Sequence, residues 1–207
     1  MTRPLPADLA KHINDTSGHR EKECQPYLLH IPDFLCRETP KRVLAQGREE
    51  ASRYGYSDYC VSAIISDGST ERRVVYVWEV KAPQSYILEF DDHPKRLRPT
   101  KDLIKAETQL FHYVEEFRQS RSFREWFHLD TMGTIVPAGI IIGSDQTLVK
   151  RSTTYNYTSD ELKRLYSISM YARNTHLYNR AAIAVKTWEW VRECFSIETD
   201  KIPVPVR

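Results

Sequence analysis

Two oppositely charged side chains stand near the end of an apolar stretch of the sequence. Residues 74–82 read VVYVWEVKA, a β-forming run in which Glu79 and Lys81 lie two positions apart. Alternate residues of a β-strand point to the same side, so the carboxylate and the ammonium group face the same way. Charges on a buried element are costly unless they bind each other, a metal ion or a substrate. The pair therefore indicates either a functional site or a structural ion pair at the end of an edge strand.

A second carboxylate is expected beside this pair. Residues 58–66 alternate and are rich in Val and Ile, and the turn-forming sequence SDGS separates them from residues 72–81. The two segments predict a β-hairpin whose register sets Asp58 opposite residues 77–80. An aspartate at the start of a strand is also often a simple turn residue, and this alternative stays open for Asp58.

Together these three residues have the chemistry of phosphodiester hydrolysis. Mg²⁺ is usually held by one or two carboxylates together with water and phosphate oxygens, and it activates water for attack. Asp58 and Glu79 would be the metal ligands, and Lys81 could orient or deprotonate the water or stabilise charge on the phosphate. The sequence Glu-Leu-Lys at 161–163 has the same pattern but begins a polar helix, so the apolar context distinguishes the first pair.

Helices are expected before and after the hairpin. Residues 20–34 have helical apolar spacing, and Glu21 or Glu23 in this segment could supply a third metal ligand. Glu21 is the preferred candidate because residues three and seven positions after it, Cys24 and Leu28, belong to the apolar stripe. A polar and possibly helical stretch follows at residues 41–53.

The second helix is predicted from residue 101 to about residue 118, with Thr100 as its N-terminal cap. Lys105, Gln109 and Tyr113 recur along it at four-residue spacing and so share one edge. Gln109 and Tyr113 could help to form the site, but they are equally typical of a hydrogen-bonded helix surface.

Basic residues are densest in the charged loop 84–99 and the helix start that follows it. The candidates for phosphate binding are Arg96, Arg98, Lys101 and Lys105, with Tyr113 as a further DNA contact. Charge runs of this kind are more often solvated loops. Beyond the helix, residues 134–143 predict a buried strand, and residues 159–196 predict an aromatic-rich helical region that packs on the core or on another subunit.

Composition limits the classes of protein that fit. The chain has 207 residues, 41% of them hydrophobic, which suits a single domain with its core at about 20–150 and a C-terminal helical extension at about 158–197. The net charge of +2 means that DNA binding depends on local basic patches.

Four widely spaced cysteines predict reduced thiols, and neither a secretory signal nor an apolar run of about 20 residues is found. A cytoplasmic protein without a membrane partner is expected.

These landmarks occur in a familiar order. Asp58, the Glu-Val-Lys sequence at 79–81, the sequence QLFHY at 109–113 and a strand ending in IIG at 141–143 resemble the PD-(D/E)xK nuclease superfamily. More narrowly, the sequences EKECQPYL at 21–28 and AETQLFHY at 106–113 are similar to the nuclease domain of the Shedu antiphage defence proteins. Ser57, which precedes Asp58, occupies the position of the proline in the PD-(D/E)xK motif.

The resemblance implies an α/β, restriction-endonuclease-like fold with a mixed central sheet flanked by helices. It implies Mg²⁺-dependent DNA cleavage in antiphage defence, with Mn²⁺ able to substitute, and a homo-oligomer, either a dimer or a tetramer. Asp58 and Glu79 would be metal ligands, Lys81 the catalytic lysine, and Gln109 a residue that orders the site. Two other functions stay open: a catalytically silent DNA-binding or scaffold module of the same fold, and a nuclease of DNA repair or recombination.

Overall fold

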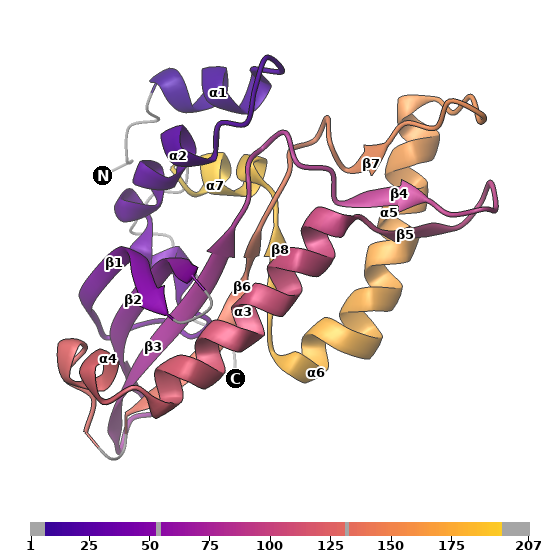
Figure 1. The fold of residues 1–207 in the computed structure, drawn as a ribbon. Coiled ribbons are helices and arrows are strands. Elements are labelled where there is room, and N and C mark those ends of the chain that lie inside the picture. Colours follow the sequence, from indigo (N-terminus) through magenta and orange to yellow (C-terminus); the bar gives the residue numbers. More distant parts are fainter. Residues whose placement is uncertain (1–6, 53–54, 131–132, 196–207) are drawn as a thin grey trace.

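A five-stranded mixed sheet forms the centre of the molecule (Figure 1). The computed structural model describes residues 7–52, 55–130 and 133–195. The strands are β1 (Arg42–Ser52), β2 (Gly55–Ser66), β3 (Glu71–Val80), β6 (Thr134–Ile141) and β8 (Ala184–Lys186), in the order β1-β2-β3-β6-β8. The first three strands pair antiparallel, whereas β6 runs parallel to both β3 and β8. The expected α/β architecture with a mixed central sheet is therefore confirmed.

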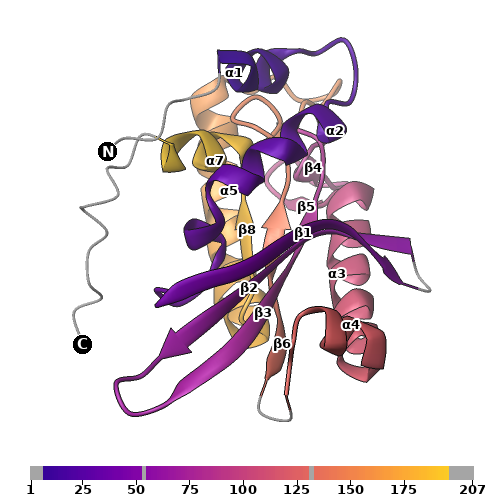
Figure 2. The ribbon, with the colours of Figure 1, turned by 90° about the vertical axis from the view of Figure 1, so that its left-hand side faces the viewer.

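Helices cover both faces of this sheet (Figures 1 and 2). On one face lie α3 (Lys101–Gln119), α4 (Arg121–Trp126) and α5 (Ser159–Arg173), which is followed by a π-helical turn, η3 (Asn174–Tyr178), and α6 (Asn179–Ala181). On the other face lie α1 (Ala7–Asn14), α2 (Glu21–Cys24), the 3-10 helices η1 (Gln25–His30) and η2 (Pro32–Leu35), and α7 (Trp188–Cys194). Each face has its own apolar core. None of the described helices has the length and apolar character needed to span a bilayer.

The predicted hairpin is present as β2 and β3. Tyr59 lies opposite Trp78 and Ser66 opposite Glu71, which is the register expected from the turn sequence. In the turn, the Asp67 carboxylate accepts hydrogen bonds from the backbone of Thr70 and Ser69, and these bonds lower the pKa of Asp67 to about 2. The local turn chemistry thus fixes the register that brings the two strands together.

The helix predicted after residue 100 is α3. The Thr100 hydroxyl accepts a hydrogen bond from the backbone N–H of Leu103, as expected of an N-terminal cap. The apolar stripe of α3 is buried against the face of the sheet formed by alternate residues of β2, β3 and β6. The cap and the stripe together set where α3 crosses the strands.

Two expectations for the N-terminal half are wrong. The stretch predicted as possibly helical at 41–53 is not a helix where it is described, because residues 42–52 form the edge strand β1, whose backbone groups are paired along β2. Residues 20–34 do not form one continuous α-helix: a single turn, α2, is followed by η1 and η2. Pro26 and Pro32 lie in the first turns of η1 and η2, and because proline has no N–H the α-helical hydrogen bonds cannot continue through them.

Two further expectations need correction. The segment 84–99 is not only a loop, because it contains β4 (Leu88–Phe90) and β5 (Leu97–Pro99), which form a small sheet with β7 (Val149–Lys150). The C-terminal region 159–196 is not helical throughout, because β8 interrupts it and adds the fifth strand to the central sheet.

Candidate active site

Glu79 and Lys81 form an ion pair at the end of β3. The Lys81 Nζ atom lies 2.5 Å from Glu79 Oε1, as expected for neighbours on the same side of an extended chain. Glu79 is 1% exposed, whereas the Lys81 side chain is 16% exposed. Because β3 lies between β2 and β6, this is not the end of an edge strand. The pair instead joins a buried carboxylate to a lysine that still reaches the surface.

This pair belongs to the face of the sheet that α3 covers. Val75 and Val77, which share the parity of Glu79 along β3, pack in the core beneath α3. On α3, Gln109 Nε2 donates a hydrogen bond to the hydroxyl of Tyr113 at 3.1 Å, and Tyr113 is buried. Gln109 Oε1 is also buried and accepts no hydrogen bond from any described residue. The predicted Gln109–Tyr113 edge thus carries a buried polar acceptor on the helix above the Glu79 face.

Asp58 is a residue of β2, but its side chain lies outside the part of the chain that the structure describes. The backbone register of the residues that follow it is described. Tyr59 pairs with Trp78, so one further step along both strands reaches Asp58 and Glu79. Cys60, two residues after Asp58, packs in the core beneath α3. The proximity of the Asp58 and Glu79 carboxylates stays a prediction. The register observed between β2 and β3 is the one that this prediction requires.

The backbone of Lys81 is held from two sides. Its N–H donates to the carbonyl of Ile141 on β6 at 2.7 Å, and its carbonyl accepts the indole N–H of Trp188 at 2.8 Å. Trp188 is fully buried at the start of α7. The C-terminal segment therefore positions the lysine, a role that the sequence pattern did not predict beyond its surplus of aromatic residues.

Gln84, which the sequence reasoning missed, connects the N-terminal helices to the chain just after Lys81. Its amide Nε2 donates to the carbonyls of His12 and Asp15, and its Oε1 accepts the backbone N–H of Arg20 at 3.0 Å. Arg20 precedes Glu21, so Gln84 holds the start of α2 close to the end of β3. This tertiary role has no signal in the local sequence.

The two glutamates of α2 differ in their surroundings. Glu21 is half-buried, whereas Glu23 is exposed and its carboxylate pairs with the Arg20 guanidinium at 3.2 Å. Glu21 therefore stays the proposed third metal ligand.

The donor chemistry suits a hard cation. Among the described side chains, no three carboxylate, imidazole or thiolate groups come together as a metal site, and that set does not include Asp58. The candidate oxygen ligands are the buried Glu79 carboxylate at the end of β3, the half-buried Glu21 at the start of α2 and the buried Gln109 Oε1 on α3. Mg²⁺ prefers such oxygen ligands. Burial raises the pKa of the Cys24 and Cys36 thiols to about 12, so these thiols stay protonated at neutral pH.

The predicted phosphate-binding residues lie on the surface beside the small sheet. Arg96 and Arg98 belong to the β4–β5 hairpin and are 68% and 58% exposed. Their guanidinium Nε atoms lie 3.4 Å from Asp91 and 3.0 Å from Glu89, respectively, so acidic neighbours balance part of their charge. Lys101 and Lys105 are exposed on the first turns of α3. Lys105 is therefore more exposed than Gln109 and Tyr113, although the three residues recur at four-residue spacing on α3.

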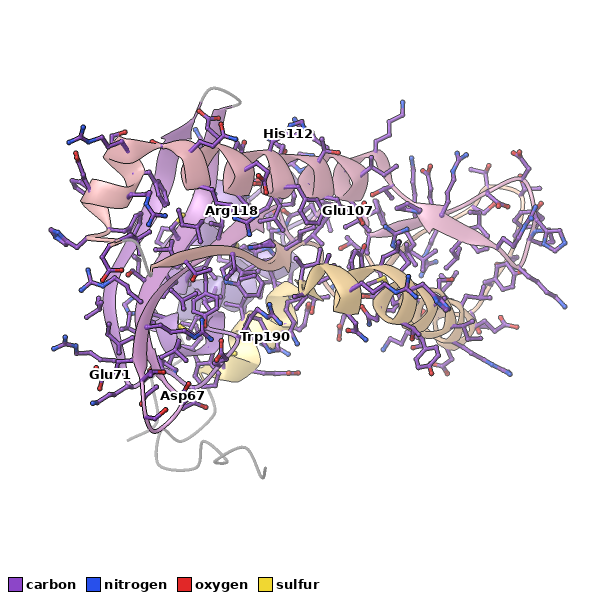
Figure 3. The ribbon with its side chains drawn as sticks, turned by 90° about the horizontal axis from the view of Figure 1, so that it is seen from below. Asp67, Glu71, Glu107, His112, Arg118 and Trp190 are labelled. Atoms are coloured by element: carbon purple, nitrogen blue, oxygen red, sulfur yellow. The ribbon has the colours of Figure 1, made fainter. Side chains whose placement is uncertain are left out.

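The aromatic-rich C-terminal region packs on the core through a polar cluster. Glu107 of α3 accepts hydrogen bonds from the hydroxyl of Tyr178, at 2.5 Å, and from the guanidinium of Arg173. Burial raises the pKa of Tyr178, so this hydroxyl stays a donor. Figure 3 shows Glu107 on the side of α3 that faces the C-terminal helices and His112 on the outer side. His112 is exposed.

Comparisons with known proteins add no relative. No family model matches the chain, and no curated protein matches it at a significant level. The candidate site therefore depends on its own geometry.

Proposed function

We propose that this protein is a metal-dependent DNA endonuclease with a restriction-endonuclease-like fold. The observation that carries the proposal is the buried Glu79 carboxylate ion-paired with Lys81 at the end of a central strand. Desolvating a carboxylate in this position costs free energy that a purely structural role at a sheet end does not require. A carboxylate that binds a divalent cation has a functional reason to be there.

The residues divide the work of phosphodiester hydrolysis. Asp58 and Glu79, with Glu21 beside them, would hold Mg²⁺, or Mn²⁺ in its place. When bound, the cation supplies Lewis acidity and lowers the pKa of a water molecule. Lys81, paired with Glu79 and still in contact with solvent, orients the attacking water and stabilises charge on the phosphate. Gln109, oriented by its hydrogen bond to Tyr113, presents its amide oxygen as a further acceptor.

The biological setting in this proposal comes from the resemblance to Shedu nuclease domains. We place the activity in antiphage defence, in the cytoplasm, with DNA as the partner and with a homo-oligomer as the working form. The proposal is tested by incubating the purified protein with linear and supercoiled DNA in Mg²⁺, in Mn²⁺ and in chelator. Cleavage in either metal and none in chelator is the expected result. DNA binding without cleavage in every condition would favour the catalytically silent module instead.

Replacing both Arg96 and Arg98 with Ala is expected to weaken DNA binding and to flatten its salt dependence. Each lost phosphate contact lowers the slope of log K against log salt by about 0.9, so the double variant should lose almost 2 from the slope. The measurement is a titration of duplex DNA at several salt concentrations in chelator. Since Asp91 and Glu89 pair with these arginines, Asp91→Asn is the informative control and should strengthen binding. An unchanged slope in the double variant would remove the β4–β5 hairpin from the DNA-binding surface.

A further inference from the structure

A pocket lies on the α3-covered face of the sheet, toward the opposite end of β3 from Glu79. It encloses about 610 Å³, and we call it the Trp126 pocket. Its floor is formed by residues of three neighbouring strands, and its wall by the end of α4: Leu44, Ser62, Arg73 and residues 125–128. Arg73 and Glu79 are six residues apart on β3, a separation of about 20 Å. The pocket is therefore distinct from the candidate active site but on the same side of the same strand.

The wall of this pocket carries an exposed tryptophan on a well-packed helix. Trp126 is 68% exposed, although Phe123 and Phe127 on either side of it are buried in the core. Their rings continue a stack with Phe117, with centroids 4.0 Å apart between Phe117 and Phe123 and 4.7 Å apart between Phe123 and Phe127. Since this stack fixes α4, the indole is held at the surface beside a pocket. Such a ring can stack on a flat aromatic ligand.

The floor of the pocket carries a hydroxyl that has no partner among the described residues. Ser62 is 1% exposed, and its buried Oγ has no hydrogen bond to any side chain or backbone group that the structure describes. A buried polar atom without a hydrogen-bond partner is energetically unfavourable, and folded proteins contain few such atoms. A ligand whose edge carries hydrogen-bonding groups would satisfy it. The pocket therefore suits a planar ring with a polar edge.

The pocket lining carries one cation, Arg73, and one carboxylate, Glu125, and the loop that closes the pocket is fixed. Arg73 Nη1 donates to the carbonyls of Phe127 at 3.1 Å and His128 at 2.8 Å, and His128 has a left-handed backbone with φ of 50°. On α4, Arg121 is 91% exposed, and its ion pair with the exposed Glu125 is too solvated to compete strongly with an anion. The Arg73 guanidinium thus lies at the floor of the pocket, and Arg121 lies one helical turn before the lining residue Glu125 on α4.

We propose that the Trp126 pocket binds one unpaired nucleotide of a DNA strand. The base stacks on Trp126 with its edge on Ser62 Oγ, and Arg121 and Arg73 attract the adjacent phosphates. This inference rests on the proposed function in taking DNA as the ligand, but binding needs neither metal nor cleavage. The distance of about 20 Å to Glu79 equals about six base pairs of B-DNA. The preferred substrate is therefore DNA with an unpaired segment close to the cut, rather than continuous duplex.

The test measures binding of a labelled oligo(dT) strand in chelator by fluorescence anisotropy, with a blunt duplex and free dTMP as competitors. Trp126→Ala should weaken oligo(dT) binding by about 5- to 150-fold, the range that one lost base stack gives. Trp126→Phe should restore most of the affinity, and Ser62→Ala should weaken binding to a smaller extent. Tyr171→Ala is the matched control, because Tyr171 is a 73% exposed aromatic residue on α5 that does not line the pocket.

The outcomes separate this inference from the proposed function. Cleavage of DNA together with unchanged oligo(dT) binding in Trp126→Ala would overturn the nucleotide pocket and leave the nuclease intact. Trp126-dependent binding in a protein that cleaves nothing would support the pocket and reject the nuclease. Competition by dTMP as strong as by the oligonucleotide would show a free-nucleotide site and overturn the assignment to a DNA strand, and so would the absence of oligo(dT) binding to the wild-type protein.

Discussion

Lys81→Ala is expected to slow Mg²⁺-dependent DNA cleavage by about 100-fold or more while leaving most of the DNA affinity in place. The reason is that Lys81 is assigned to the chemical step, where a positioned proton-transfer or charge-stabilising group typically contributes about 10²–10⁴ in rate. Its ammonium group pairs with Glu79 and its side chain is 16% exposed, so under the proposed function it would act on a phosphate held by a metal ion at Glu79. The measurement is the single-turnover cleavage rate together with DNA affinity in chelator.

Two further variants make the result interpretable. Lys81→Ala also leaves a buried carboxylate without this ion pair, which is expected to lower the free energy of unfolding by about 3–5 kcal/mol. Lys81→Arg keeps the positive charge and so tests the chemistry in a folded protein, because a guanidinium cannot transfer a proton. Lys163→Ala removes the lysine from the same Glu-x-Lys pattern on α5 and should leave cleavage unchanged. Normal rates in folded Lys81→Ala and Lys81→Arg would show that Lys81 is structural.

Gly139→Ala is expected to lower the free energy of unfolding by about 3 kcal/mol or more, because the β6–β8 junction has no room for a methyl group. A Cβ at this position would lie 2.2 Å from the carbonyl oxygen of Ala184 and 2.6 Å from the Trp78 ring. The first is backbone of β8, and the second is fixed by a 2.8 Å hydrogen bond from the Trp78 indole to the carbonyl of Leu35. Chemical denaturation with wild-type protein as the reference measures the change.

The effect of Gly139→Ala should reach the candidate site as well. Trp188, whose indole holds the Lys81 carbonyl, lies two residues after the end of β8, so displacement of β8 displaces that contact. Gly18→Ala is the matched control, because its Cβ would meet nothing within 4 Å, and its stability should change by no more than about 0.5 kcal/mol. Equal denaturation midpoints for Gly139→Ala and Gly18→Ala would contradict this packing.

The elements that could be predicted from the sequence are those with a local cause. The β2–β3 hairpin follows from alternation and from the Asp67 turn, and α3 follows from the Thr100 cap and its apolar stripe. By contrast, β1 and β8 are edge strands of the sheet, and they form because a neighbouring strand supplies hydrogen-bond partners. The local sequence of residues 41–53, or of the three residues of β8, does not predict that a neighbouring strand will pair with them.

The same distinction applies to the candidate site. The Glu79–Lys81 pair could be predicted because two residues of one strand at a spacing of two meet without any tertiary contact. Gln84 and Trp188 could not, since each acts by binding backbone groups of segments far away in the sequence. The Trp126 pocket could not be predicted either, because Ser62 and Trp126 line the same pocket only after three strands and α4 have packed together.

The most direct test of the central claim compares Glu79→Ala with Glu161→Ala on linear and supercoiled DNA, each in Mg²⁺, in Mn²⁺ and in chelator. Glu161 belongs to the other Glu-x-Lys sequence, where it only caps α5 through Thr158. The account predicts metal-dependent cleavage by the wild type and by Glu161→Ala, and none by a folded Glu79→Ala protein. Cleavage by Glu79→Ala at the wild-type rate would show that the end of β3 is not the active site.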